Sequence, residues 1–117
     1  MSLPTIDQVQ SGERIELLRV YQSTLNERPF DPEIHRANIA NLTILSELCM
    51  DPDMYPISIG AKRHMCECAN LLFRILHGMR PDEQWEASKQ FYAMIIPLIE
   101  DIISVSDLED LFEMTSI

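Results

Sequence analysis

The chain has 117 residues, of which 46% are hydrophobic, and a formal net charge of −10 at pH 7, which suits one domain with a single core. It has neither an apolar run of about 20 residues nor an N-terminal basic stretch followed by an apolar one, so we expect a cytoplasmic protein with no membrane contact. Residues 82–117 carry nine acidic residues and one basic residue, Lys89, which disfavours direct nucleic-acid binding because phosphates are neutralised by Lys and Arg.

A capping-box pattern near the N-terminus predicts the first helix. Thr5 and Gln8 have the required spacing, and apolar residues recur at helical spacing after them, so we expect a helix over about 5–27. Gly12 lies inside this range and costs a helix on the order of 1 kcal/mol relative to Ala. In the alternative, the helix starts at Ser11 and the first ten residues pack as a separate arm.

The sequence Asp-Pro-Glu at residues 31–33 predicts the start of the second helix. A carboxylate caps the helix, proline is tolerated at the first position, and the acid faces the positive helix end. The apolar pattern continues to about residue 50, with Asn38, Asn41 and Thr43 expected on the polar side.

A third helix is predicted over about 58–78, because Gly78 suits the left-handed position just past a helix end. Its apolar residues cover more than one face, and Leu71 and Phe73 point away from the main stripe. We therefore expect this helix either to lie centrally in the bundle or to be shared with a second subunit.

Asp82 predicts the cap of a fourth helix, whose apolar pattern includes Ser88 and continues past Pro97. Proline inside a helix removes a hydrogen bond, so we expect a kink or two abutting pieces there. Ser106 and Glu109 form a second capping box, which predicts a short final helix.

These elements predict an all-α fold, with residues 1–117 forming one compact bundle of four to five helices. The sequence has only three glycines and few stretches that alternate polar and apolar residues, which argues against a sheet.

The cysteines and histidines give the nearest approach to a metal site. The odd number of cysteines, Cys49, Cys66 and Cys68, indicates reduced thiols. His64 and Cys68 lie one helical turn apart, but two ligands are too few, and a third would have to come from Cys49 or His77. We expect no metal and no cofactor, and keep a metal or redox sensor built on Cys49, His64, Cys66 and Cys68 as an alternative function.

Catalytic motifs are missing from the sequence. It has no glycine-rich phosphate loop, no Gly-x-Ser-x-Gly and no His-Glu-x-x-His. His35 lacks the lysine and glycine that follow the histidine of phosphotransfer domains, so we expect it to be an exposed surface residue. We expect no enzymatic activity, and a non-catalytic subunit of a helical enzyme remains a second alternative.

The strongest functional clue is a surplus of apolar residues toward the acidic end of the chain. The surplus consists of Ile95, Ile96, Leu98, Ile99, Ile102, Ile103, Val105, Leu108, Leu111 and Phe112. These residues either complete the core, or form a homodimer interface or a helix face that docks on another protein. Residues 107–114 have the pattern of an acidic amphipathic helix that inserts its apolar face into a groove.

The sequence therefore predicts a small acidic regulatory or inhibitory protein of the anti-activator, antitoxin or immunity type. We expect it to act as a homodimer that occludes another protein with a basic surface, a DNA-binding regulator being one such target. The residues expected to bind the partner are Ile99, Ile102, Ile103, Asp107, Leu108, Glu109, Asp110, Leu111 and Phe112.

Overall fold

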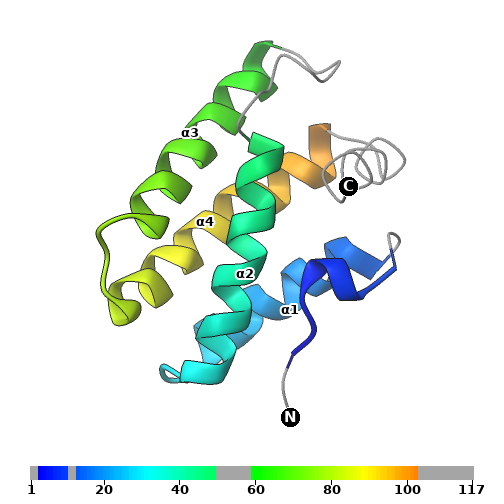
Figure 1. Cartoon of the computed structure of the whole chain (residues 1–117). Helices are drawn as coiled ribbons and strands as arrows, with labels where there is room; N and C mark the ends of the chain where they lie inside the picture. Colours follow the sequence, from blue (N-terminus) through cyan, green and yellow to red (C-terminus); the bar gives the residue numbers. More distant parts are fainter. Residues whose placement is uncertain (1–2, 11–12, 50–58, 103–117) are drawn as a thin grey trace.

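The structure is a computed structural model that describes residues 3–10, 13–49 and 59–102 (Figure 1). The side chains of Leu48, Ile99, Asp101 and Ile102 lie outside this description. The described elements are a short 3-10 helix and four α-helices: η1 (Ile6–Gln8), α1 (Arg14–Glu27), α2 (Pro32–Cys49), α3 (Ile59–Leu76) and α4 (Pro81–Ile102).

The helices form a compact bundle in which α4 packs against both α1 and α3, and α2 packs against α3. Figure 1 shows α2 in front of α4, with the second half of α3 on one side of α2 and the last turn of α4 on the other. The described ranges contain no strand. The predicted all-α bundle is confirmed.

The first helix starts later than the capping box indicated. Thr5 and Gln8 do form a capping box, with the Thr5 N–H donating to Gln8 Oε1 at 2.9 Å, but they cap only the single turn of η1. Helix α1 begins at Arg14. The prediction of one helix over 5–27 is wrong at its N-terminal end. The alternative of a separate arm is confirmed, although α1 begins at Arg14 and not at Ser11.

Side chains of α1 and α2 hold this arm by its main chain. Asn41 Oδ1 accepts the Ile6 N–H at 2.9 Å, the Arg14 Nε–H donates to the Ile6 carbonyl at 3.3 Å, and the Tyr21 hydroxyl donates to the Pro4 carbonyl at 2.7 Å. The Ile6 side chain is 1% exposed. Burial of Ile6 and these three hydrogen bonds stabilise the arm in place of additional helical turns.

The other helix ends follow local signals in the sequence. Asp31 Oδ1 accepts the N–H groups of Glu33 at 2.9 Å and Ile34 at 3.3 Å, and so caps α2 as predicted. Gly78 follows α3 with φ of +93°, a conformation that other residues adopt only with strain. Helix α4 continues past Pro97 as one element and not as two separate pieces.

The core contains a buried polar layer that the helical pattern did not predict. Asn38 and Asn41, expected on the polar side of their helix, are both buried. The Asn38 amide donates to Ser88 Oγ at 3.0 Å, and the Tyr92 hydroxyl donates to Asn38 Oδ1 at 2.7 Å. The Asn38 amide is tolerated inside because its partners on α4 satisfy both its oxygen and its nitrogen, and Asn41 Oδ1 is satisfied by the Ile6 N–H of the arm.

Candidate protein-binding surface

Helix α3 has one buried face and one exposed face. The buried residues are Ala61, Met65, Cys68, Leu71, Leu72 and Ile75. The exposed residues opposite them include Ile59, Cys66 and Phe73, which lie seven positions apart and therefore on one side of the helix. Ile59 is 79% exposed and Phe73 is 66% exposed, whereas Leu71 packs in the core.

We call this exposed side the α3 surface. It comprises Ile59, Arg63, Cys66, Asn70, Phe73, Arg74 and His77, the last of which lies just beyond the end of the helix. At 100° per residue, these positions fall within about a third of the helix circumference. The apolar residues outside the main stripe of α3 thus divide into Leu71, which completes the core, and Phe73, which the described residues leave largely uncovered.

A groove runs along the α3 surface beside α2. It has a volume of about 460 Å³ and is lined by Ser46 of α2 and by Ala69, Asn70, Phe73, Leu76 and His77 of α3 and its end. The rings of Phe73 and His77 are in contact, with centroids 4.6 Å apart, and the His77 N–H donates to the Phe73 carbonyl at 3.0 Å. The rim of the groove is therefore aromatic and is held in place by the last turn of the helix.

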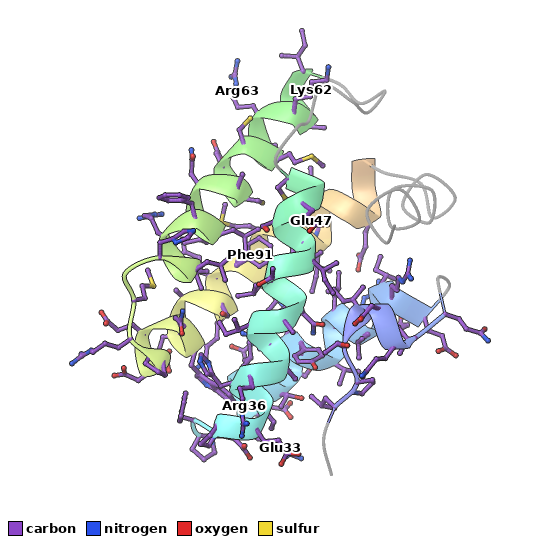
Figure 2. The ribbon with its side chains drawn as sticks, in the orientation of Figure 1. Glu33, Arg36, Glu47, Lys62, Arg63 and Phe91 are labelled. Carbon is purple, nitrogen blue, oxygen red and sulfur yellow. The ribbon has the colours of Figure 1, made fainter. Side chains whose placement is uncertain are left out.

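The α3 surface is basic although the chain as a whole is acidic. Helix α3 carries Lys62, Arg63 and Arg74 against Glu67, a net charge of +2. Among the described residues, Arg63 and Arg74 form no ion pair. Figure 2 shows Arg63 projecting outward from the beginning of α3. The surface thus combines apolar and positively charged groups, which suits an acidic amphipathic ligand.

Helix α4 has the opposite charge. It carries five acidic residues and Lys89, which gives a net charge of −4. Near its end, Glu100 Oε1 accepts a hydrogen bond from Arg19 Nε of α1 at 2.8 Å. This pair holds the last turn of α4 beside α1, and Figure 1 shows this turn on the side of α2 opposite the second half of α3.

The cysteines do not form a site with the histidines in the part of the chain that the structure describes. Burial raises the pKa of Cys49 to about 12 and that of Cys68 to about 11, whereas Cys66 and His64 are exposed. Since metals bind the thiolate, a raised pKa disfavours a metal ligand. In the described ranges, no three His, Cys, Asp or Glu side chains could hold one ion, so the sensor hypothesis gains no support.

His35 is half-buried, and the expectation of an exposed surface residue is wrong. Its ring packs against Phe30, with centroids 5.3 Å apart, and Phe30 in turn contacts Trp85 edge-to-face at 5.5 Å. Burial lowers the pKa of His35. The reason is tertiary: α4 brings Trp85 against the corner between α1 and α2, and this covers part of the imidazole.

The structure buries part of the C-terminal apolar surplus in the core. Ile95, Ile96 and Leu98 are buried, so for these three the alternative of completing the core is confirmed. Among the predicted partner-binding residues, Ile99 and Ile102 lie in the last turn of α4 with their side chains outside the description. The others lie outside the described residues: Ile103, Asp107, Leu108, Glu109, Asp110, Leu111 and Phe112.

The sequence indicated a second apolar face on α3 that includes Phe73, but the predicted partner-binding residues did not include it. Ile59, Cys66 and Phe73 recur every seven residues on the side opposite the core stripe. Such a repeat indicates a second apolar face, but only the packing of α2 and α4 determines that this face stays uncovered.

None of the described helices is long and apolar enough to span a membrane. Comparison with protein-family models, curated proteins and solved structures gave no match to this chain.

Proposed function

We propose that this protein is a small regulatory or inhibitory protein without turnover of its own, which acts by binding and occluding another polypeptide. The observation that carries the proposal is the groove of about 460 Å³ whose rim holds the largely exposed Phe73. Large aromatic residues at the centre of a surface patch supply much of the affinity of protein interfaces.

Burial of the exposed Phe73 side chain against a partner is favourable in free energy. Full burial of a phenylalanine side chain stabilises a complex by about 1.5–3 kcal/mol relative to exposure. Among the residues that the structure describes, the other large apolar side chains are mostly covered, and Val20, Phe30 and Ile59 are the further exposed ones. Ile59 lies on the same surface as Phe73, so α3 presents the larger apolar contact.

The acidic C-terminal residues are the second element of the proposal. In this mechanism, the apolar residues from Ile99 to Phe112 add affinity, while Asp107, Glu109 and Asp110 speed encounter with a basic surface. A DNA-binding regulator fits as a target, because its nucleic-acid face is basic. We further propose that the protein is a homodimer and acts in the cytoplasm, where its free cysteines would stay reduced.

Affinity purification from the native host tests the proposal. The bait proteins are the wild-type chain, Phe73→Asp, and Val20→Asp as a matched control, because Val20 is an exposed apolar residue of α1, 43% exposed and away from α3. We expect a protein that is retained by the wild type and by Val20→Asp and lost with Phe73→Asp. Equal recovery of every captured protein by all three baits would contradict the proposal.

The identity of the captured protein separates the proposed function from its alternative. A transcriptional regulator, toxin or other effector whose activity falls when this chain is added supports regulation by occlusion. An enzyme whose activity requires this chain would instead support the non-catalytic subunit. Purified components then allow the inhibition to be titrated with the wild type and with Phe73→Asp.

A further inference from the structure

The chain carries a segment whose chemistry is complementary to the α3 surface. Residues 103–117 contain no basic residue and four acidic ones: Asp107, Glu109, Asp110 and Glu113. Leu108, Leu111 and Phe112 have the i, i+3, i+4 spacing that puts apolar side chains on one face of a helix. The segment is thus apolar and acidic, whereas the α3 surface is apolar and basic.

We propose that the α3 surface binds the C-terminal segment, residues 106–114, of a second copy of this chain, so that two copies exchange their segments in a symmetric dimer. This inference rests on the proposed function, because both use the α3 surface. The C-terminal segment of the second copy therefore competes with the regulated partner for that surface. Each copy contributes one groove and one segment, which gives an interface that closes at two copies.

The dimensions of the two parts agree. Nine residues of helix are about 13 Å long, and Arg63 and Arg74, eleven positions apart on α3, are separated by about 16 Å along the axis. A helix over 106–114 therefore fits between the two arginines. Its apolar face meets Phe73 in the groove, and its acidic residues lie within reach of the arginine side chains, which form no ion pair with the described residues.

A second copy is favoured over the same chain because the connection between α4 and the segment is short. Only residues 103–105 separate the end of α4 from the segment, and the four Cα–Cα steps from residue 102 to residue 106 span about 14 Å when extended. Arg19 holds Glu100, in the last turn of α4, beside α1, and Figure 1 places this turn and the second half of α3 on opposite sides of α2. The groove at the second half of α3 is therefore more accessible to the segment of a second copy than to the segment that leaves its own α4.

Complementation between two full-length variants tests the exchange. Phe73→Asp keeps the segment and damages the groove, while the double variant Leu108→Asp/Phe112→Asp keeps the groove and damages the segment. By sedimentation velocity we expect the wild type and Val20→Asp to dimerise, and each of the two groove or segment variants alone to associate at least tenfold more weakly. An equimolar mixture of these two variants restores dimers, because one intact groove meets one intact segment.

Several results would overturn the inference. If the wild-type chain stays monomeric at about 200 µM, the proposed dimer does not form. If the mixture of the two variants contains no more dimer than each variant alone, the segments are not exchanged. If either variant alone dimerises as strongly as the wild type, the dimer interface lies elsewhere. A segment bound within its own chain predicts a monomeric wild type and no complementation, and is therefore separated from exchange by the same experiment.

The exposed thiol of Cys66 provides a second readout that does not depend on hydrodynamics. Cys66 lies on the α3 surface one heptad before Phe73 and is exposed, whereas Cys49 and Cys68 are buried. We expect the modification rate of Cys66 to fall several-fold as wild-type concentration rises, and to return toward the monomer rate in 500 mM salt, because salt screens the arginine–carboxylate attraction. A Cys66 rate that does not vary with concentration would contradict a segment seated on this surface.

Failure of this inference and failure of the proposed function are distinguishable. If the chain is monomeric but Phe73→Asp loses a host protein that the wild type retains, regulation by occlusion stands, and both the exchange and the proposed homodimer fall. If the variants complement but no host protein depends on Phe73, the exchange stands and the regulatory function falls.

Discussion

The buried contact between Asn38 and Tyr92 gives the sharpest prediction about stability. The Tyr92 hydroxyl donates to Asn38 Oδ1 at 2.7 Å, and the Asn38 amide donates to Ser88 Oγ at 3.0 Å. All three side chains are fully buried, so a group that loses its partner has no water to replace it. Asn38→Leu removes the acceptor of the Tyr92 hydroxyl, and Tyr92→Phe removes the donor to Asn38.

The magnitude follows from the cost of a buried polar group without a partner, which is about 1–3 kcal/mol. We expect each single substitution to lower the free energy of unfolding by about that amount. The double variant, Asn38→Leu/Tyr92→Phe, removes both sides of the bond and should lose about 1–2 kcal/mol less than the sum of the two single losses. Each 1 kcal/mol corresponds to about 4 °C in Tm for a domain of this size.

Urea unfolding followed by the fluorescence of Trp85, the single tryptophan and a buried one, measures these differences. All variants are compared at one protein concentration, because dimer formation would add to the apparent stability. Ala40→Leu serves as the control on the exposed side of α2 and should change stability by less than about 0.5 kcal/mol. Additivity of the two core substitutions within about 0.5 kcal/mol would refute the assigned bond.

Three further predictions concern single groups. A disulfide reagent at pH 8 should modify Cys66 within seconds to minutes, and Cys49 and Cys68 only after unfolding. The reason is that burial raises the pKa of Cys49 to about 12 and that of Cys68 to about 11. Fast modification of all three thiols in the native state would contradict this burial. Gly78→Ala should lower the free energy of unfolding by about 1 kcal/mol in urea titrations, because φ is +93° there. Burial lowers the pKa of His35 in the folded state, so protonation of His35 favours the unfolded chain. The free energy of unfolding should therefore fall as pH drops below about 6.5. His35→Gln should make that fall smaller when unfolding is measured from pH 7.5 to 5.5.

Local signals in the sequence determined where most of the helices begin and end. The Asp31 cap and the Gly78 terminus each act within one turn of chain, so neighbouring residues are enough to recognise them. The start of α1 was ambiguous for the opposite reason. The arm is held by Asn41 and Tyr21, whose approach depends on how α1 and α2 pack.

The same distinction explains the polar core. Asn38 and Asn41 have the sequence pattern of an exposed helix face, and Ser88 and Tyr92, the partners of Asn38, lie 50 and 54 positions along the chain. A helical periodicity describes one helix at a time and contains no information about partners at such separations. Only the contact between helices converts an apparent surface amide into a satisfied interior one.

The sequence by itself determined the all-α class and the separation of the acidic C-terminal part from the rest. The tertiary structure decided which apolar side chains are buried and which remain exposed. Ile95, Ile96 and Leu98 became core because α4 packs against α1 and α3, whereas Phe73 stayed exposed beside a groove because the helices that cover α3 reach only its other face. Hydrophobicity drives burial without direction, and the geometry of packing determines which side chains it covers.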